Sequence, residues 1–256
     1  MPGGKISMSI QQFMTINRLL NGLRAADFAL LEPHLRYRNF ALKEYVERQG
    51  QPIDYAIFFD SAIASTVASS PGGEDVEVGL IGFEGMSGTA LVLRGDTAPL
   101  DTYVQSAGYG YAVPARAFMA AVKQSRTLEA RLLLYIQTMI VQASSTALVN
   151  GTADAETRLA RWLLMLHDRS AGSNIAITHQ FIAVMLAMHR PWVTETLHVL
   201  EGKHLIRSTR GNVQILDRAG LIAEARGFYG MAEEAYERIM ARRDAPSGAD
   251  LRIVES

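Results

Sequence analysis

The chain has 256 residues, a formal net charge of −1 and an apolar share of 48%, so it can form two modest domains, each with a core. It contains no cysteine, which excludes disulfides, thiol redox switches and cysteine-ligated iron–sulfur clusters. We find neither a secretory signal pattern nor a run of about 20 apolar residues, so the sequence predicts a cytoplasmic protein that does not enter the membrane.

The N-terminal part predicts a helical region followed by strands. Residues 11–31 have helical spacing with a break near Gly22, and residues 1–9 are expected to be a loose end. Between residues 35 and 113, short apolar runs alternate with glycine-rich turns, which is typical of a sandwich or barrel. The clearest strands are residues 56–59, 62–67, 76–81 and 103–106, and turns are expected at 50–52, 70–73 and 108–110.

The helical period returns after Pro114. Residues 116–123 predict a short helix and residues 128–149 a long one, which Asn150 and Gly151 are expected to end at a hinge. A seam with spacing 4, 3, 4, 3, 4 predicts a dimer interface along the long helix; it consists of Leu128, Leu132, Tyr135, Met139, Gln142 and Thr146. The alternative is that this helix packs on its own strands, for which the face that carries Leu133, Leu134, Ile136 and Ile140 is available.

Residues 177–217 contain the pattern that is most informative about function. Thr178 can cap a short helix with Ile182 on its apolar face, and Pro191 can open a second helix after a turn at residues 187–189. Two strand-like runs then flank a hairpin turn at residues 210–212. A helix-turn-helix followed by a β-wing is a DNA-reading unit, because the major groove admits one α-helix.

The charge distribution agrees with this interpretation. Between residues 158 and 218 there are eight cationic and four anionic side chains, a local charge of +4, and five of the six histidines also lie there. A locally basic segment in a neutral chain is suited to phosphate contact. After it, a last helix is expected over residues 218–243, interrupted around Gly227 and Gly230, with a frayed end at 244–256.

Residues 178–216 resemble the C-terminal domain of the Crp/Fnr family of bacterial transcription factors. The resemblance is carried by Thr178, Gln180, Ile182, Ala183, Leu186, Arg190, Val193, Thr194, Leu197, Leu200, Glu201, Leu205 and Ile206. It implies an α+β chain with an N-terminal β-roll (jelly-roll-like) sensor domain, a long dimerisation helix and a C-terminal winged helix-turn-helix. In this sequence, residues 1–113 correspond to an N-terminal helix and the β-roll, and residues 114–150 to the dimerisation segment and hinge. Residues 151–230 correspond to the winged helix-turn-helix, and residues 231–256 to a C-terminal helix and frayed tail.

The resemblance also implies a function. A homodimer would read a palindromic operator in double-stranded DNA with residues 189–201 in the major groove, and would contact RNA polymerase. Base contacts are expected from Arg190, Trp192, Thr194, Glu195 and His198, and phosphate contacts from Thr178, His179, Ser208 and Arg210. Arg190 stands where the family has an arginine that reads guanine. Pro191, Trp192 and Glu195 depart from the family pattern, so the operator should differ from the usual one.

In this family, an effector binds the β-roll through a glycine-rich phosphate cassette, to which residues 82–89 correspond. The candidate effector residues are Glu84, Gly85, Ser87 and Arg94. Gly95 and Asp96 follow Arg94, where the family has a hydroxyl residue and alanine. We therefore expect a small effector other than cyclic AMP, or none, and no cofactor.

Other classes of function lack support in the sequence. No GxSxG, P-loop, HExxH or CxxC motif occurs, so no enzyme activity is expected. A metal site is not expected either, since His167, His179 and His189 would have to fold together. One rival hypothesis stays open, an effector-sensing module whose divergent helix-turn-helix contacts a protein partner instead of DNA.

Overall fold

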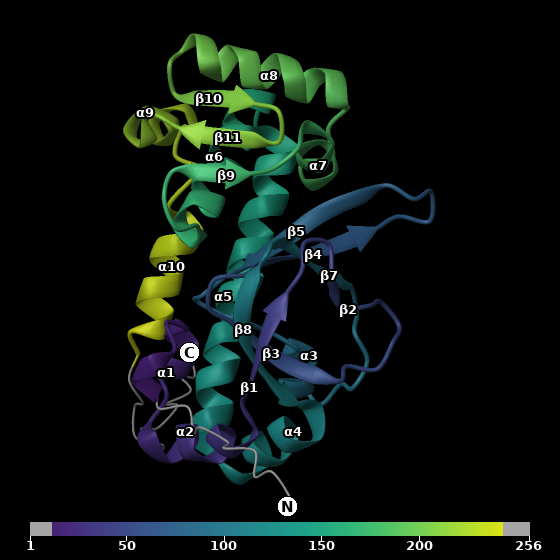
Figure 1. Cartoon of the computed structure of the whole chain (residues 1–256), viewed down its shortest axis with the longest axis vertical. Coiled ribbons are helices and arrows are strands. Elements are labelled where there is room, and N and C mark those ends of the chain that lie inside the picture. The colour runs from purple at the N-terminus through teal and green to yellow at the C-terminus, as the bar shows by residue number, and fades with distance from the viewer. Residues whose placement is uncertain (1–11, 243–256) are drawn as a thin grey trace, which may run out of the picture.

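The computed structural model describes residues 12–242, and every structural statement below concerns that part of the chain. A long helix, α5 (Arg126–Thr152), runs through the middle of the molecule, with a β-roll beside it and a winged helix at one end (Figure 1). The chain begins with η1 (Gln12–Met14), α1 (Arg18–Asn21), α2 (Ala25–Leu31) and η2 (Glu32–His34). The predicted break near Gly22 is confirmed, since α1 ends there.

Two four-stranded antiparallel sheets form the β-roll. One has the strand order β1-β8-β3-β6 and the other β2-β7-β4-β5. The strands are β1 (Arg36–Phe40), β2 (Tyr45–Glu47), β3 (Tyr55–Phe59), β4 (Ile63–Ser69), β5 (Asp75–Ile81), β6 (Met86–Ser87), β7 (Asp101–Ser106) and β8 (Gly108–Pro114). The short helix α3 (Thr89–Val92) follows β6. The four clearest strands of the sequence are confirmed, and β1, β2, β6 and β8 are additional.

The turn expected at residues 108–110 is wrong, because β8 begins at Gly108. Gly110 pairs with Phe59 of β3, and a Cβ at this position would lie 2.3 Å from the carbonyl oxygen of Phe58. The glycine is therefore required by a close approach of two strands and does not mark a chain reversal.

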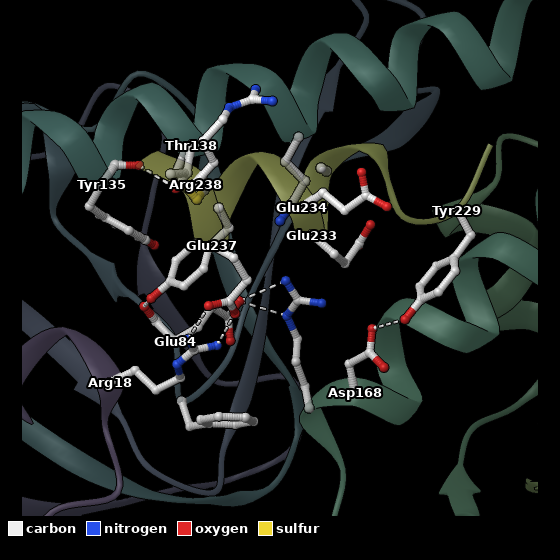
Figure 2. A pocket seen from close by; sticks show the side chains of 16 residues that line it. Arg18, Glu84, Tyr135, Thr138, Asp168, Tyr229, Glu233, Glu234, Glu237 and Arg238 are labelled. Atoms are coloured by element: carbon white, nitrogen blue, oxygen red, sulfur yellow. Dashed lines mark hydrogen bonds and ion pairs between the residues drawn. The ribbon is translucent and has the colours of Figure 1, made fainter. Parts of the chain in front are cut away.

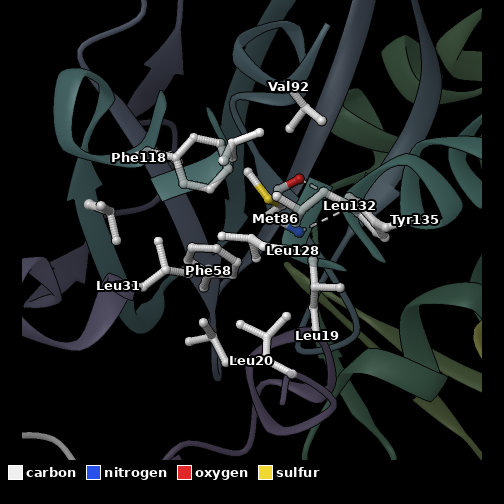
Figure 3. Packing of buried hydrophobic residues seen from close by; sticks show 14 of the residues in the cluster. Leu19, Leu20, Leu31, Phe58, Met86, Val92, Phe118, Leu128, Leu132 and Tyr135 are labelled. Carbon is white, nitrogen blue, oxygen red and sulfur yellow. Dashed lines mark hydrogen bonds between the residues drawn. The ribbon is translucent and has the colours of Figure 1, made fainter. Parts of the chain in front are cut away.

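One face of the β-roll is covered by α4 (Ala115–Gln124) and α5. Figure 3 shows Phe118 of α4 against Phe58 of β3, with Leu128 and Leu132 of α5 beside them. The ring centroids of Phe58 and Phe118 are 6.3 Å apart. Tyr135 completes this layer, and its hydroxyl group donates to the carbonyl of Met86 at 3.0 Å.

This packing corrects the predicted dimer seam. Leu128, Leu132, Tyr135 and Gln142 are buried in the chain's own core, with exposed fractions of 8% or less, while Met139 and Thr146 are half-buried. A second chain cannot reach the four buried residues, because the β-roll occupies that side of α5. Of the alternative face, Ile136 and Leu134 also pack on the core, whereas Leu133 and Ile140 are exposed.

The helix also continues beyond its expected end. Asn150 and Gly151 lie within α5, and the next helix, α6 (Ala155–Arg169), begins after Asp154. The carboxylate of Asp154 accepts from the backbone N–H of Thr157 at 2.9 Å, an N-cap that fixes the start of α6. The helix break expected at residues 150–151 therefore lies at Ala153 and Asp154.

By length and composition alone, α5 could cross a membrane, with a mean hydropathy of 1.5 over its most apolar 18 residues. Residues 132–149 contain no charged side chain, although polar residues interrupt this stretch and it is not a continuous apolar run. One face of α5 packs on the β-roll, and 39% of that window is buried in the molecule. Core helices of globular proteins pass the same test, so the hydropathy of α5 alone is weak evidence for a membrane span.

The remaining elements form a winged helix and a returning helix. After β9 (Asn174–Ala176) come α7 (His179–Met185), α8 (Arg190–Gly202), β10 (Ile206–Thr209), β11 (Asn212–Ile215), α9 (Arg218–Glu224) and α10 (Met231–Met240). The three strands form a small sheet in the order β10-β11-β9. The predicted interruption is confirmed, since Gly227 and Gly230 both have positive φ and separate α9 from α10. The expected loose ends, residues 1–9 and 244–256, lie outside the described residues.

The winged helix shares a core with the β-roll. Ile63, Val67 and Leu80 of the roll belong to the same buried cluster as α6 and the helix-turn-helix. The indole N–H of Trp162 in α6 donates to the carboxylate of Glu77 in β5 at 2.8 Å. Phe181 of α7 lies edge-on to Tyr103 of β7, with the ring centroids 6.1 Å apart.

Candidate nucleic-acid interface

The helix-turn-helix consists of α7, the turn at residues 186–189 and α8. The hydroxyl of Thr178 accepts from the backbone N–H of Phe181 at 3.2 Å, which confirms its expected role as the cap of α7. Ala187 has a positive φ of 46° in the turn, and Pro191 occupies the first turn of α8. Val193, Leu197 and Leu200 are fully buried, which fixes the rotation of α8 and directs its opposite face to solvent.

That solvent-facing side carries four of the five predicted base-reading residues. Arg190, Trp192, Glu195 and His198 are exposed, Trp192 to 60%. Within residues 12–242 none of these four side chains makes a hydrogen bond or ion pair; Trp192 only stands edge-on to the ring of His189 at 5.9 Å. Their polar groups are therefore available to a partner outside the chain.

The fifth residue, Thr194, has an internal role. Its hydroxyl lies 3.1 Å from Nδ1 of His179, whose Nε2 lies 3.3 Å from the hydroxyl of Ser208. Burial, with the neighbouring charge of Arg190, lowers the pKa of His179, so the imidazole is neutral near pH 7 and bridges two hydroxyls. The carboxylate of Glu201 accepts from the backbone N–H of Ser208 at 2.6 Å. These contacts attach the wing to α7 and α8.

Most of the cationic side chains between residues 158 and 218 are bonded within the chain. Five of the eight cationic side chains bind groups of this chain: Arg158 the carbonyl of Leu186, Arg161 the hydroxyl of Thr146, Arg169 the carboxylate of Glu84, Lys203 that of Glu224 and Arg218 that of Asp168. Arg190, Arg207 and Arg210 are exposed and have no partner in the described part of the chain. The positive charge available to phosphate therefore lies on α8 and the wing.

The wing itself is a short hairpin. Thr209 of β10 pairs with Asn212 of β11 across a turn formed by Arg210 and Gly211, and Gly211 has a φ of 78°. Glycine provides this left-handed conformation without strain. Arg210 is thus carried at the tip of the wing.

The four candidate effector residues do not form one site. Glu84 is bound to Arg169 of α6 at 2.7 Å, and Gly85 packs under Tyr135 so closely that a Cβ would lie 2.2 Å from the Tyr135 hydroxyl. Ser87 is buried in β6, and its hydroxyl has no partner among the described residues. Arg94 is exposed, with a φ of 67° after α3. Within the described residues, Glu84 is thus paired with Arg169 and not with Arg94, the one arginine of the predicted phosphate cassette.

The histidines lie in separate surroundings. His167 is bonded to Arg218 at 2.9 Å, His179 lies between Thr194 and Ser208, and His189 contacts Trp192. Within residues 12–242 no group of three or more His, Asp or Glu side chains is arranged to hold a metal ion.

Comparison with known proteins agrees with this geometry. Residues 157–224 match the Crp-like helix-turn-helix domain family. No curated protein matches the chain. Solved structures with the same fold include a transcriptional regulator of the Crp/Fnr family from Eubacterium rectale, with a TM-score of 0.66 and 18% identity, covering 83% of this chain and 99% of that one. FixK2 from Bradyrhizobium japonicum has a TM-score of 0.64 and 14% identity, covering 74% and 96%. A CRP-family regulator from Thermus thermophilus has a TM-score of 0.63 and 20% identity, covering 74% and 97%.

Proposed function

We propose that this chain, which is a DNA-binding transcription regulator of the Crp/Fnr family, acts in the cytoplasm as a homodimer that reads a palindromic operator. The observation that carries the proposal is the exposed row of Arg190, Trp192, Glu195 and His198 on α8, whose polar groups have no partner within the described residues. The unpaired arginines of the wing lie beside it. Other proteins that a regulator can contact, such as RNA polymerase, belong to the same proposal.

The residues on α8 suggest how bases are read. The guanidinium of Arg190, in the first turn of α8, can donate two parallel hydrogen bonds to O6 and N7 of guanine. Glu195 can accept from N4 of cytosine, since no described cation pairs with it. Arg210 at the wing tip is placed to contact phosphate, with Thr178, His179 and Ser208 supporting the same surface.

The dimer would form through the exposed face of α5. Eight of its exposed positions follow the spacing 4, 3, 4, 3, 4, 3, 4, namely Arg126, Ala130, Leu133, Gln137, Ile140, Ser144, Ala147 and Gly151; Leu148 and Thr152 near its C-terminal end are exposed as well. Ile140 is 61% and Leu133 43% exposed, and the small residues allow two helices to approach closely. Two α8 helices related by a two-fold axis would then lie about 34 Å apart, one turn of DNA.

The DNA-reading proposal is tested by selection from random duplex DNA with the wild type, Arg190→Ala and Arg116→Ala. Arg116 is an exposed arginine of α4, so its variant is a control for loss of one positive charge. We expect wild type and Arg116→Ala to enrich the same inverted repeat, and Arg190→Ala to lose about 1–3 kcal/mol at one base position.

One observation favours a second candidate function, a protein partner on the same surface: Trp192 is 60% exposed, and tryptophan is enriched at protein interfaces. If no variant enriches any sequence and binding is only salt-sensitive and unspecific, the DNA-reading proposal fails and this candidate replaces it.

The dimer proposal is tested by analytical ultracentrifugation of Ile140→Glu and Leu93→Glu. Leu93 is an equally exposed leucine, 59%, that lies outside α5. We expect Ile140→Glu to be monomeric at concentrations where wild type and Leu93→Glu are dimers, since two carboxylates would face each other across the axis. A dimeric Ile140→Glu variant would assign the interface to another surface.

A further inference from the structure

A cavity of about 610 Å³ lies between the β-roll, α5, α6 and α10. Phe83 and Glu84 from the loop after β5 line one side, Tyr135 and Met139 of α5 another, and residues of α6 and α10 line the rest of this partly open cavity (Figure 2). The volume lies in the range of small-molecule sites, about 300–1,000 Å³. Of the four effector residues expected from the sequence, only Glu84 belongs to the cavity wall.

Aromatic side chains provide much of the wall. The hydroxyl of Tyr236 donates to the carbonyl of Glu84 at 2.8 Å, and that of Tyr229 donates to Asp168 at 2.8 Å. Tyr135 is bound in the same way to the backbone of Met86. Because these hydroxyls are already bonded, the rings themselves, together with Phe83, are what the wall offers a ligand. Aromatic walls bind apolar groups and organic cations.

The charged groups of the wall are predominantly acidic. Five carboxylates and three guanidinium groups line the cavity. Arg18 is bound to Glu237 at 2.7 Å, Arg169 to Glu84 at 2.7 Å and Arg218 to Asp168 at 2.6 Å, so the carboxylates of the wall without an ion-pair partner among the described residues are Glu233 and Glu234. Figure 2 shows the carboxyl groups of Glu84, Asp168 and Glu233, which come from three different elements, around the same space. An anionic ligand such as a nucleotide would be repelled there, whereas an ammonium group would be attracted.

We propose that this cavity binds a small organic amine, with its apolar part against the aromatic rings and its ammonium group beside the carboxylates, and that the bound amine changes the affinity of the winged helix for DNA. The second half of the proposal rests on the proposed DNA-reading function. The first half stands on the cavity alone.

The location explains why binding and DNA affinity would be coupled. The ion pair of Arg169 with Glu84 joins α6, the first helix of the DNA-binding domain, to the β-roll, and both side chains are nearly buried. Asp168 and Arg169 from α6 lie across the cavity from Tyr135 and Thr138 of α5. A ligand that fills the space contacts both sides, so its affinity depends on how the two parts are placed relative to each other.

The binding test uses the full chain, 2-phenylethylamine and its anionic counterpart 3-phenylpropionate, with ligand-observed NMR titration. The test variant is Glu233→Gln, which removes a carboxylate but keeps an oxygen for the backbone N–H of Gly230 that caps α10. Glu129→Gln, on α5 and outside the cavity wall, is the matched control. We expect saturable binding of the amine only, at least about fivefold weaker in Glu233→Gln and unchanged in Glu129→Gln.

The result that overturns the site is no saturable amine binding, equal binding of the acid, or equal affinity in both variants. Coupling is measured separately, as the affinity of wild type for its selected DNA with and without the amine. A change that Glu233→Gln reduces supports the coupling, and no change refutes it while leaving the site in place. If the chain selects no DNA either with or without the amine, the proposed function and the coupling fail together, and the NMR titration still decides the site.

Discussion

The winged helix has two surfaces that are built in opposite ways. The side that faces the β-roll buries its polar groups in pairs, as Trp162 does with Glu77 and Arg169 with Glu84. The side that carries α8 leaves Arg190, Glu195 and His198 exposed and without a described partner. A buried polar group must be hydrogen-bonded within the chain, whereas an exposed polar group can be hydrogen-bonded to water until a partner binds. Substitutions on the first surface should therefore change stability, and those on the second should change DNA affinity.

The largest effect is expected from Trp162→Ala. Trp162 is 2% exposed, and its removal leaves a cavity and takes a donor from the buried carboxylate of Glu77. We expect a loss of about 3–5 kcal/mol in the free energy of unfolding, measured by urea denaturation and circular dichroism. Trp192, the chain's other tryptophan, is 60% exposed and gives the matched control, for which we expect a change within about 0.5 kcal/mol. Equal losses in the two variants would contradict the contrast between the surfaces.

A smaller effect, which depends on pH, is expected from Glu77→Gln. Burial raises the pKa of Glu77 from 4.5 to about 7. Because the folded state holds the proton more tightly than the unfolded state, this residue stabilises the fold fully below pH 4.5, and that contribution is lost as the pH rises through 7.

Glutamine keeps an acceptor for Trp162 and has no charge to bury. The unfolding free energy of Glu77→Gln relative to wild type should rise by on the order of 2 kcal/mol between pH 5 and pH 8. Urea denaturation at both pH values measures it, with the exposed Glu74→Gln as control. The same difference at the two pH values would mean that the carboxylate is not buried in solution.

On the exposed surface, Glu195→Ala should act on specificity alone. If Glu195 accepts from cytosine N4, its removal should reduce discrimination at one base pair by about 1–2 kcal/mol and leave the unfolding midpoint unchanged. Competition binding against single-base variants of the selected operator measures this. A uniform gain in affinity for all sequences would show instead that Glu195 only repels the DNA backbone.

The smallest change in affinity is expected from Arg210→Ala at the wing tip. Loss of one phosphate contact should weaken binding by less than about 1 kcal/mol for every sequence and reduce the slope of log K against log salt by about 1. Fluorescence anisotropy at several salt concentrations measures both quantities. Lys203→Ala serves as the control, because Lys203 is already paired with Glu224. An equal loss of DNA affinity in the two variants would contradict a phosphate contact that is specific to the wing tip.

The sequence predicted local features well where short-range chemistry determines them. Thr178 caps α7 and Gly227 and Gly230 interrupt the last helix, because capping and positive φ depend on neighbouring residues. The face that α5 buries could not be predicted, because both faces have heptad-like spacing and only the β-roll decides between them. Gly110 was misread for a related reason, since its partner Phe58 is distant in sequence.

For the candidate site too, local features could be predicted from the sequence and long-range ones could not. The exposed residues of α8 follow from the helical period alone. The internal partners of Thr194, Arg169 and Arg218 depend on long-range packing, so counting charges overestimated the surface available to phosphate. The cavity beside α10 had no signal in the sequence, because its walls come from distant segments that meet only in the folded chain.

The return of α10 to the central helix has a mechanical consequence. Ile239 and Met240 of α10 are buried in the same cluster as Leu19 and Phe118, and Arg131 of α5 donates to the carbonyl of Met240 at 2.5 Å. The winged helix is therefore attached at both of its ends, on entry through Asp154 and on exit through α10, in addition to the core that it shares with the β-roll. A movement of α8 relative to the β-roll has to rearrange this shared core while both ends of the domain stay connected to the central helix.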